Sequence, residues 1–77
     1  MTPESEAALR SLRKLARGHP GASSGERAAF DLLANLQQGA PVDMADCLVS
    51  LDSTGRRALL KVLLDLASGR TGLGELR

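Results

Sequence analysis

The chain has no Ile, Trp or Tyr, and it has one Phe, one Cys and one His in 77 residues. A single cysteine excludes an internal disulfide, and one cysteine with one histidine cannot supply the four ligands of a structural zinc site. Side chains that commonly carry out chemistry are therefore scarce and unclustered. We expect no catalytic residues, no cofactor, no metal and no enzymatic activity.

Residues that favour β-strands are also few, because the chain holds only three Val and three Thr. Its apolar residues are instead dominated by fifteen Leu and eleven Ala, which lose little side-chain freedom in a helix. The composition predicts an all-α fold, and the length predicts a single domain over residues 1–77.

Charge and hydropathy give no sign of a membrane or of a strongly anionic partner. Ten Lys and Arg balance nine Asp and Glu, so no overall field attracts the chain to nucleic acid or lipid. The most apolar stretch, residues 58–67, is about half as long as a membrane-spanning helix. The N-terminal residues are acidic and lack the pattern of a signal peptide. We expect a cytoplasmic protein that does not contact a membrane.

Capping residues divide the chain into helices. Candidate N-caps stand at the start of each apolar-periodic segment, and these are Thr2, Ser23, Asp43 and Asp52. Gly18, Gly39 and Gly69 stand where three of the segments stop. The pattern predicts a compact four-helix fold with a loose C-terminal tail, with helices at about 3–17, 24–38, 44–51 and 54–68 and the tail at 69–77.

The helix expected at 54–68 has an apolar arc of about 200° at 100° per residue, which predicts that it is the central helix. Leu63 is expected in the core, and Asp65 is expected on a solvent-facing stripe. Leu60 and Leu64 are then left on a second apolar flank, and Phe30 is offset similarly on the helix at 24–38. This flank meets either another helix of the same chain or another chain, and a homodimer is one such arrangement.

Four cations lie on one face of the first expected helix at i, i+3, i+4 and i+7: Arg10, Arg13, Lys14 and Arg17. We name them the basic strip. One interpretation is a docking strip for phosphates or for acidic residues of a partner protein. The other is an ordinary solvated face whose last cations complement the helix C-terminus.

A helix-turn-helix could be drawn through residues 24–51, but its chemistry argues against DNA reading. The helix that would enter the groove carries Asp43 and Asp46 in place of the basic and amide side chains that bind base edges. Nucleic-acid binding is therefore the less favoured alternative. His19 is expected in an exposed loop, and Cys47 is expected to be a small buried hydrophobe.

Two segments carry a resemblance. Residues 28–36 read Ala-Ala-Phe-Asp-Leu-Leu-Ala-Asn-Leu, and residues 41–52 read Pro-Val-Asp-Met-Ala-Asp-Cys-Leu-Val-Ser-Leu-Asp. Followed by a Leu-rich helix, they resemble short all-helical proteins of unknown function encoded by proteobacterial phages and plasmids, over residues 8–68. That family has no assigned activity or functional residues.

The resemblance implies a mobile-element accessory protein that binds and blocks a host protein. Inhibitors that mimic DNA are commonly strongly acidic, and this chain is not, so mimicry is disfavoured. We therefore expect a non-enzymatic protein-interaction module, an accessory inhibitor of a host protein whose identity the sequence does not give. The alternative is a small dimeric DNA-associated regulator.

Overall fold

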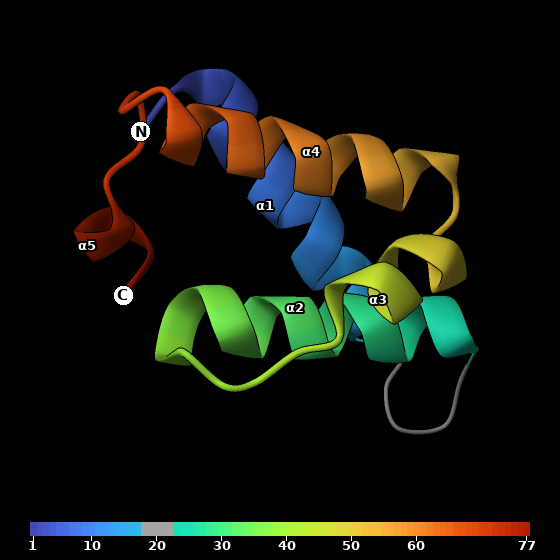
Figure 1. Cartoon of the computed structure of the whole chain (residues 1–77). Coiled ribbons are helices and arrows are strands. Elements are labelled where there is room, and N and C mark those ends of the chain that lie inside the picture. The colour runs from blue at the N-terminus through green and yellow to red at the C-terminus, as the bar shows by residue number, and fades with distance from the viewer. Residues whose placement is uncertain (18–22) are drawn as a thin grey trace.

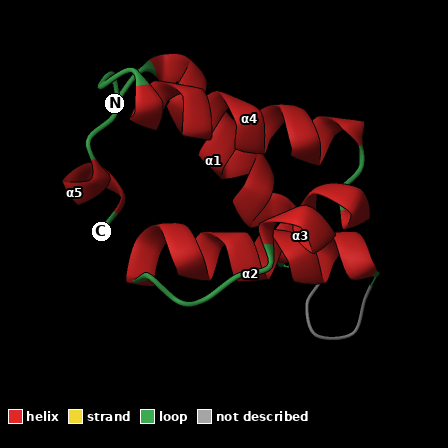
Figure 2. Ribbon diagram, viewed as in Figure 1, coloured by secondary structure: helices red, strands yellow, loops and turns green. Residues whose placement is uncertain are grey.

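The computed structural model describes residues 1–17 and 23–77, and within these residues all regular structure is helical (Figures 1 and 2). The prediction of an all-α fold is confirmed. The expected loop histidine, His19, lies outside the described residues. The described helices are α1 (Pro3–Ala16), α2 (Ser24–Gln38), α3 (Met44–Ser50), α4 (Ser53–Ala67) and α5 (Leu73–Leu76).

The predicted N-caps are confirmed in the four longer helices. In each, the cap side chain accepts a hydrogen bond from a backbone N–H three residues later, and the caps are Thr2, Ser23, Asp43 and Asp52. Such caps satisfy N–H groups that have no partner within the helix. Gly39 ends α2 with φ of 72°, a left-handed conformation that glycine adopts without steric cost. The helix ends therefore lie within one residue of the predicted ones.

The central helix is α1, so the expectation that the fourth helix is central was wrong. α1 packs against both α2 and α4, whereas α4 packs chiefly against α1, and Figure 1 shows α2 and α4 as separate helices with α1 between them. Three buried residues of α1 are small, namely Ser5, Ala8 and Ala16. Small side chains let two helices approach the same helix closely, which an apolar-arc argument does not take into account.

The core of α4 is centred one residue away from its expected position. Leu59 and Val62 are fully buried, but Leu63 is only half-buried. Leu63 therefore packs against the edge of the core and does not lie at its centre, so its expected core position is confirmed only in part. Because α4 packs chiefly against α1, the side of α4 that carries Val62 faces α1 and the opposite side is left in solvent.

The C-terminal segment is packed, which contradicts the expected loose tail. α5 contacts α2, and its Leu76 is buried. Arg77 donates from Nε to the Leu36 carbonyl at 3.2 Å and from Nη2 to the Asn35 carbonyl at 3.2 Å. These partners lie more than forty residues earlier in the chain. The prediction of a loose tail used only the nearby glycines, Gly72 and Gly74, and could not include such distant contacts.

The arrangement predicts that two adjacent leucines of α4 contribute very differently to stability. Leu59→Ala removes a fully buried side chain and should lower the free energy of unfolding by about 2–5 kcal/mol. Leu60→Ala, at a position 55% exposed, should change it by less than about 0.5 kcal/mol. Urea unfolding of both variants measures the difference, and equal losses would contradict the described packing of α4.

Candidate functional site

The basic strip lies on the exposed side of the central helix. Arg10, Arg13 and Lys14 belong to α1, Arg17 is its C-terminal cap, and all four residues are exposed. Their side chains border a shallow hollow of about 310 Å³. Within residues 1–17 and 23–77, no ion pair or hydrogen bond of these four side chains is found. The strip is therefore a local positive charge that the rest of the described chain does not neutralise.

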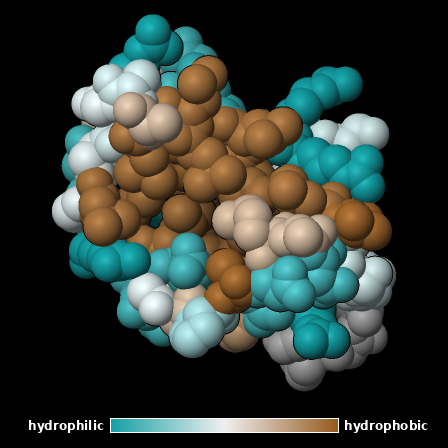
Figure 3. Space-filling view, viewed as in Figure 1, coloured by the Kyte–Doolittle hydropathy of each residue, from teal (hydrophilic) through white to brown (hydrophobic). Residues whose placement is uncertain are grey.

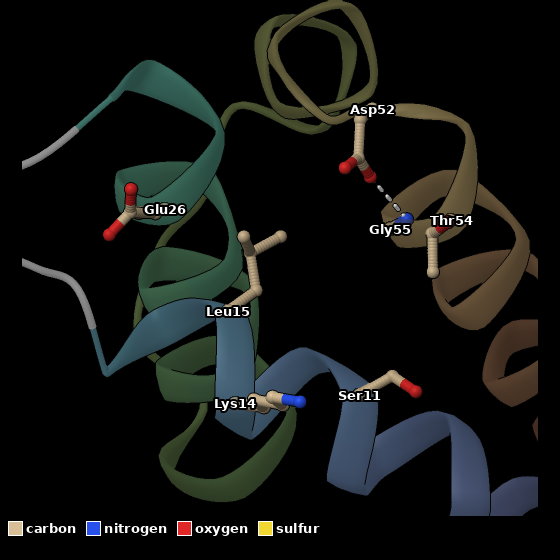
Figure 4. Close-up of a pocket in the computed structure, with 7 residues that line it drawn as sticks. All are labelled: Ser11, Lys14, Leu15, Glu26, Asp52, Thr54 and Gly55. Carbon is tan, nitrogen blue, oxygen red and sulfur yellow. Dashed lines mark hydrogen bonds between the residues drawn. The ribbon is translucent and has the colours of Figure 1, made fainter.

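A larger hollow of about 530 Å³ adjoins the strip at Lys14. Figure 4 shows side chains from three helices around it, with Lys14 and Leu15 from α1, Glu26 from α2, and Asp52 near the start of α4. The Asp52 carboxylate is already engaged, because it accepts the Gly55 N–H at 2.7 Å. No histidine or cysteine is among the lining residues. The hollow offers two hydroxyl groups, two carboxylates, one ammonium group and a leucine for binding.

An apolar surface lies over α4. Figure 3 shows apolar side chains gathered over this helix and over the surface between it and α2. Leu60 is 55% exposed and Leu64 is 60% exposed, on the side of α4 turned away from Val62. Phe30, which is 48% exposed, belongs to α2. The expected apolar flank is therefore divided between two helices. Leu60 and Leu64 lie on α4 and Phe30 lies on α2, and each of these helices packs on α1.

Asp65 is a buried acid, which contradicts its expected place on a solvent-facing stripe. Its side chain is fully buried where the start of α1 meets the end of α4. The Oδ2 atom accepts hydrogen bonds from Ser5 Oγ at 2.5 Å and Thr2 Oγ1 at 2.7 Å, and Oδ1 lies 3.2 Å from the Lys61 ammonium. Thr2 therefore caps α1 and binds α4 with the same hydroxyl.

The hydrogen bonds from Ser5 and Thr2, with a smaller contribution from Lys61, lower the pKa of Asp65 from 3.8 to about 2, against the opposing effect of burial. Each of these contacts favours the charged carboxylate. The contacts hold two helices together and leave no open face for a ligand. We therefore assign Asp65 to the stability of the fold and exclude it from the candidate binding surfaces.

Cys47 and Asp43 contribute to the fold, as a core residue and as a helix cap. Cys47 is buried, and this burial raises the pKa of its thiol, in agreement with its predicted role as a small hydrophobe. Asp43 caps α3 as predicted. Among the described residues, no group of three or more His, Cys, Asp or Glu side chains is placed to hold a metal ion.

The chain has no match among known proteins. No family model, curated protein or solved structure matches the chain. No helix in the described part of the chain has the length and apolar character that crossing a membrane requires.

The Asp65 contacts predict a specific dependence of stability on pH. The pKa of Asp65 is lower in the folded state than its ordinary 3.8, so its contribution is present above about pH 4 and is lost as the pH falls towards about 2. Asp65→Asn should therefore lower the melting temperature at neutral pH. The difference between wild type and variant should shrink between pH 4 and pH 2.

Thermal unfolding followed by circular dichroism across this pH range measures the effect. Asp43→Asn is the matched control, because Asn also caps helices well and residue 43 is exposed. This control should keep the pH dependence of the wild type. A difference between wild type and Asp65→Asn that stays constant down to pH 2 would show that the Asp65 carboxylate has no such role.

Proposed function

We propose that this chain is a non-enzymatic protein-interaction module whose basic strip binds an acidic surface on another protein. The observation that carries the proposal is the unneutralised charge of Arg10, Arg13, Lys14 and Arg17 on one exposed helix face. The opposite side of that helix is fixed by packing against α2 and α4. The backbone that carries the strip is therefore already ordered before a partner binds, and binding does not have to order it.

The spacing of the strip suits a partner with regularly placed carboxylates. Residues 10, 13, 14 and 17 cover two turns of α1, and each turn rises about 5.4 Å. An acidic helix laid along α1 repeats its side chains at the same interval. Arginine, which provides three of the four cations, can bind carboxylates with two parallel hydrogen bonds. Complementary charge of this kind mainly raises the association rate and selects the partner.

The proposed biological setting follows from the resemblance to phage and plasmid proteins. A small mobile-element accessory protein in the cytoplasm would use the strip to bind and block a host protein. The nearly balanced charge of the whole chain suits this mode better than imitation of DNA, because only one face carries a strong local charge.

A small DNA-associated regulator is the alternative, because the same four cations could bind phosphates. The structure offers little for reading bases. Exposed Asp43 and Asp46 stand at the start of α3, where a recognition helix would approach the phosphates of the duplex. Any DNA binding would therefore use α1 and depend little on sequence.

Charge reversal of the strip tests the proposal. Arg10→Glu/Arg13→Glu/Arg17→Glu should leave the helical circular dichroism signal unchanged, because exposed cations contribute little to stability. In a pull-down from lysate of the source cells, wild type should retain a partner that the triple variant does not. Raising the salt concentration should weaken the wild-type interaction in the same way.

A single-site pair controls for net charge. Arg13→Glu and Arg27→Glu change the charge of the chain equally, but Arg27 lies on α2 and outside the strip. Only Arg13→Glu should weaken partner binding. A gel-shift titration with duplex DNA of arbitrary sequence distinguishes the alternative. Strong salt-dependent shifts by wild type that the triple variant loses would favour the DNA regulator, and equal partner recovery by both proteins would show that the strip is only solvated.

A further inference from the structure

The hollow of about 530 Å³ is continuous with the basic strip, because Lys14 lines both this hollow and the smaller one that the four cations border. We name the larger one the Leu15 hollow. It lies between the second half of α1 and the first turn of α4 (Figure 4). A partner that binds the strip therefore meets the Leu15 hollow at Lys14.

The Leu15 hollow presents an apolar side chain that the fold already holds in position. Leu15 is half-buried and packs against the core. Gly55 lies next to it, and a Cβ atom at residue 55 would lie 3.4 Å from Leu15 Cδ2 and only 2.9 Å from Leu51 Cδ2. The absence of a side chain at Gly55 thus brings α4 close to Leu15 without covering it. An apolar side chain of a partner that enters the hollow would leave water against an ordered leucine.

Charges of opposite sign line different parts of the Leu15 hollow. Lys14 stands on α1, whereas Glu26 and Asp52 stand at the starts of α2 and α4. Among the described residues, no ion pair joins Lys14 to either carboxylate. A ligand that carries only negative charge would be attracted at Lys14 and repelled at Glu26 and Asp52. The lining therefore favours a ligand whose charge changes sign along its length.

We propose that the Leu15 hollow binds an apolar side chain of the partner, at the point where an acidic segment bound to the basic strip gives way to a basic residue. This inference rests on the proposed function and adds the chemistry of the partner. Carboxylates lie on the strip, an apolar side chain lies on Leu15, and a cation lies near Glu26 and Asp52. The strip attracts acidic segments in general, and the hollow selects among them.

Synthetic peptides test the proposal by fluorescence anisotropy. The first peptide carries four glutamates next to a Leu-Lys pair. The second has Ala in place of the Leu, the third has Glu in place of the Lys, and each is made in both chain directions. Wild type should bind the better direction of the first peptide about tenfold more tightly than the second, as expected for a partly buried leucine. It should also bind the third peptide more weakly, because that peptide brings a carboxylate towards Glu26 and Asp52.

Filling the hollow provides a matched pair of variants. Thr54→Phe places a large side chain at an exposed position that lines the hollow, so this variant should bind the Leu and Ala peptides equally. Ala67→Phe is the control, because it places the same side chain at an exposed position at the opposite end of α4. The control should keep the preference of about tenfold for the Leu peptide. Circular dichroism checks that both variants keep the helical signal.

The outcomes separate this inference from the proposed function. Equal affinity of wild type for the Leu and Ala peptides, with both lost in the triple charge-reversal variant, would overturn the hollow as a binding site and leave the strip in place. A preference for Leu that Thr54→Phe retains would also overturn it, because the leucine would then bind elsewhere. No binding of any peptide at millimolar concentration would overturn this inference together with the binding of acidic segments by the strip.

Discussion

The position of α1 between α2 and α4 is the constraint on which the other features depend. Both α2 and α4 pack on this helix, and they can do so because its buried surface combines the small residues Ala8 and Ala16 with Leu9 and Leu12. Since the inward side of α1 is used for this packing, its cations are confined to the outward side. Since α4 packs mainly on α1, its opposite leucines remain in solvent. The two candidate surfaces are therefore consequences of one packing arrangement.

Arginine side chains from outside α2 and α3 bind the C-terminal ends of these two helices. α2 and α3 have no basic residue in their own last turns, and the end of each helix binds an arginine that lies later in the chain. Arg77 binds carbonyls at the end of α2, and Arg56 donates to the Leu48 carbonyl at 2.7 Å at the end of α3. These arginines satisfy carbonyl groups that have no partner within the helix and complement the helix dipole.

Asp65 joins the start of α1 to the end of α4. Its carboxylate accepts the hydroxyl groups of Thr2 and Ser5, and Lys61 lies against its second oxygen. A buried carboxylate is tolerated only when such partners replace its lost hydration. The start of α1 is thus fixed to the end of α4 by a charged group, whereas the middle of the same pair is held by apolar side chains.

Features that depend on neighbouring residues were predictable from the sequence, and features that depend on distant ones were not. The caps at Thr2 and Asp52 and the left-handed Gly39 follow from local hydrogen bonding and backbone sterics. The burial of Asp65 and the packing of Arg77 require partners about sixty and forty residues away. The spacing of Lys61 and Asp65 is equally typical of an exposed ion pair, so no local signal distinguished the buried case.

The same limit applies to the candidate surfaces. The exposure of the basic strip and of Leu60 and Leu64 agrees with the helical periodicity of the sequence. The identity of the central helix could not be predicted, because a wide apolar arc indicates how much surface a helix could bury and does not show how much the fold covers. The wide apolar arc of α4 therefore predicted the wrong central helix. The small buried residues of α1 allow two helices to pack on it, and α1 is the central helix.

Native-state amide hydrogen exchange tests the central position of α1 most directly. If α2 and α4 both depend on α1, the amides around Leu9 and Leu12 should exchange only through global unfolding, with protection that matches the unfolding free energy from urea. Amides at the ends of α4 should exchange earlier. Faster exchange in α1 than in α4 would contradict the account, because it would show that α4 remains folded when α1 opens.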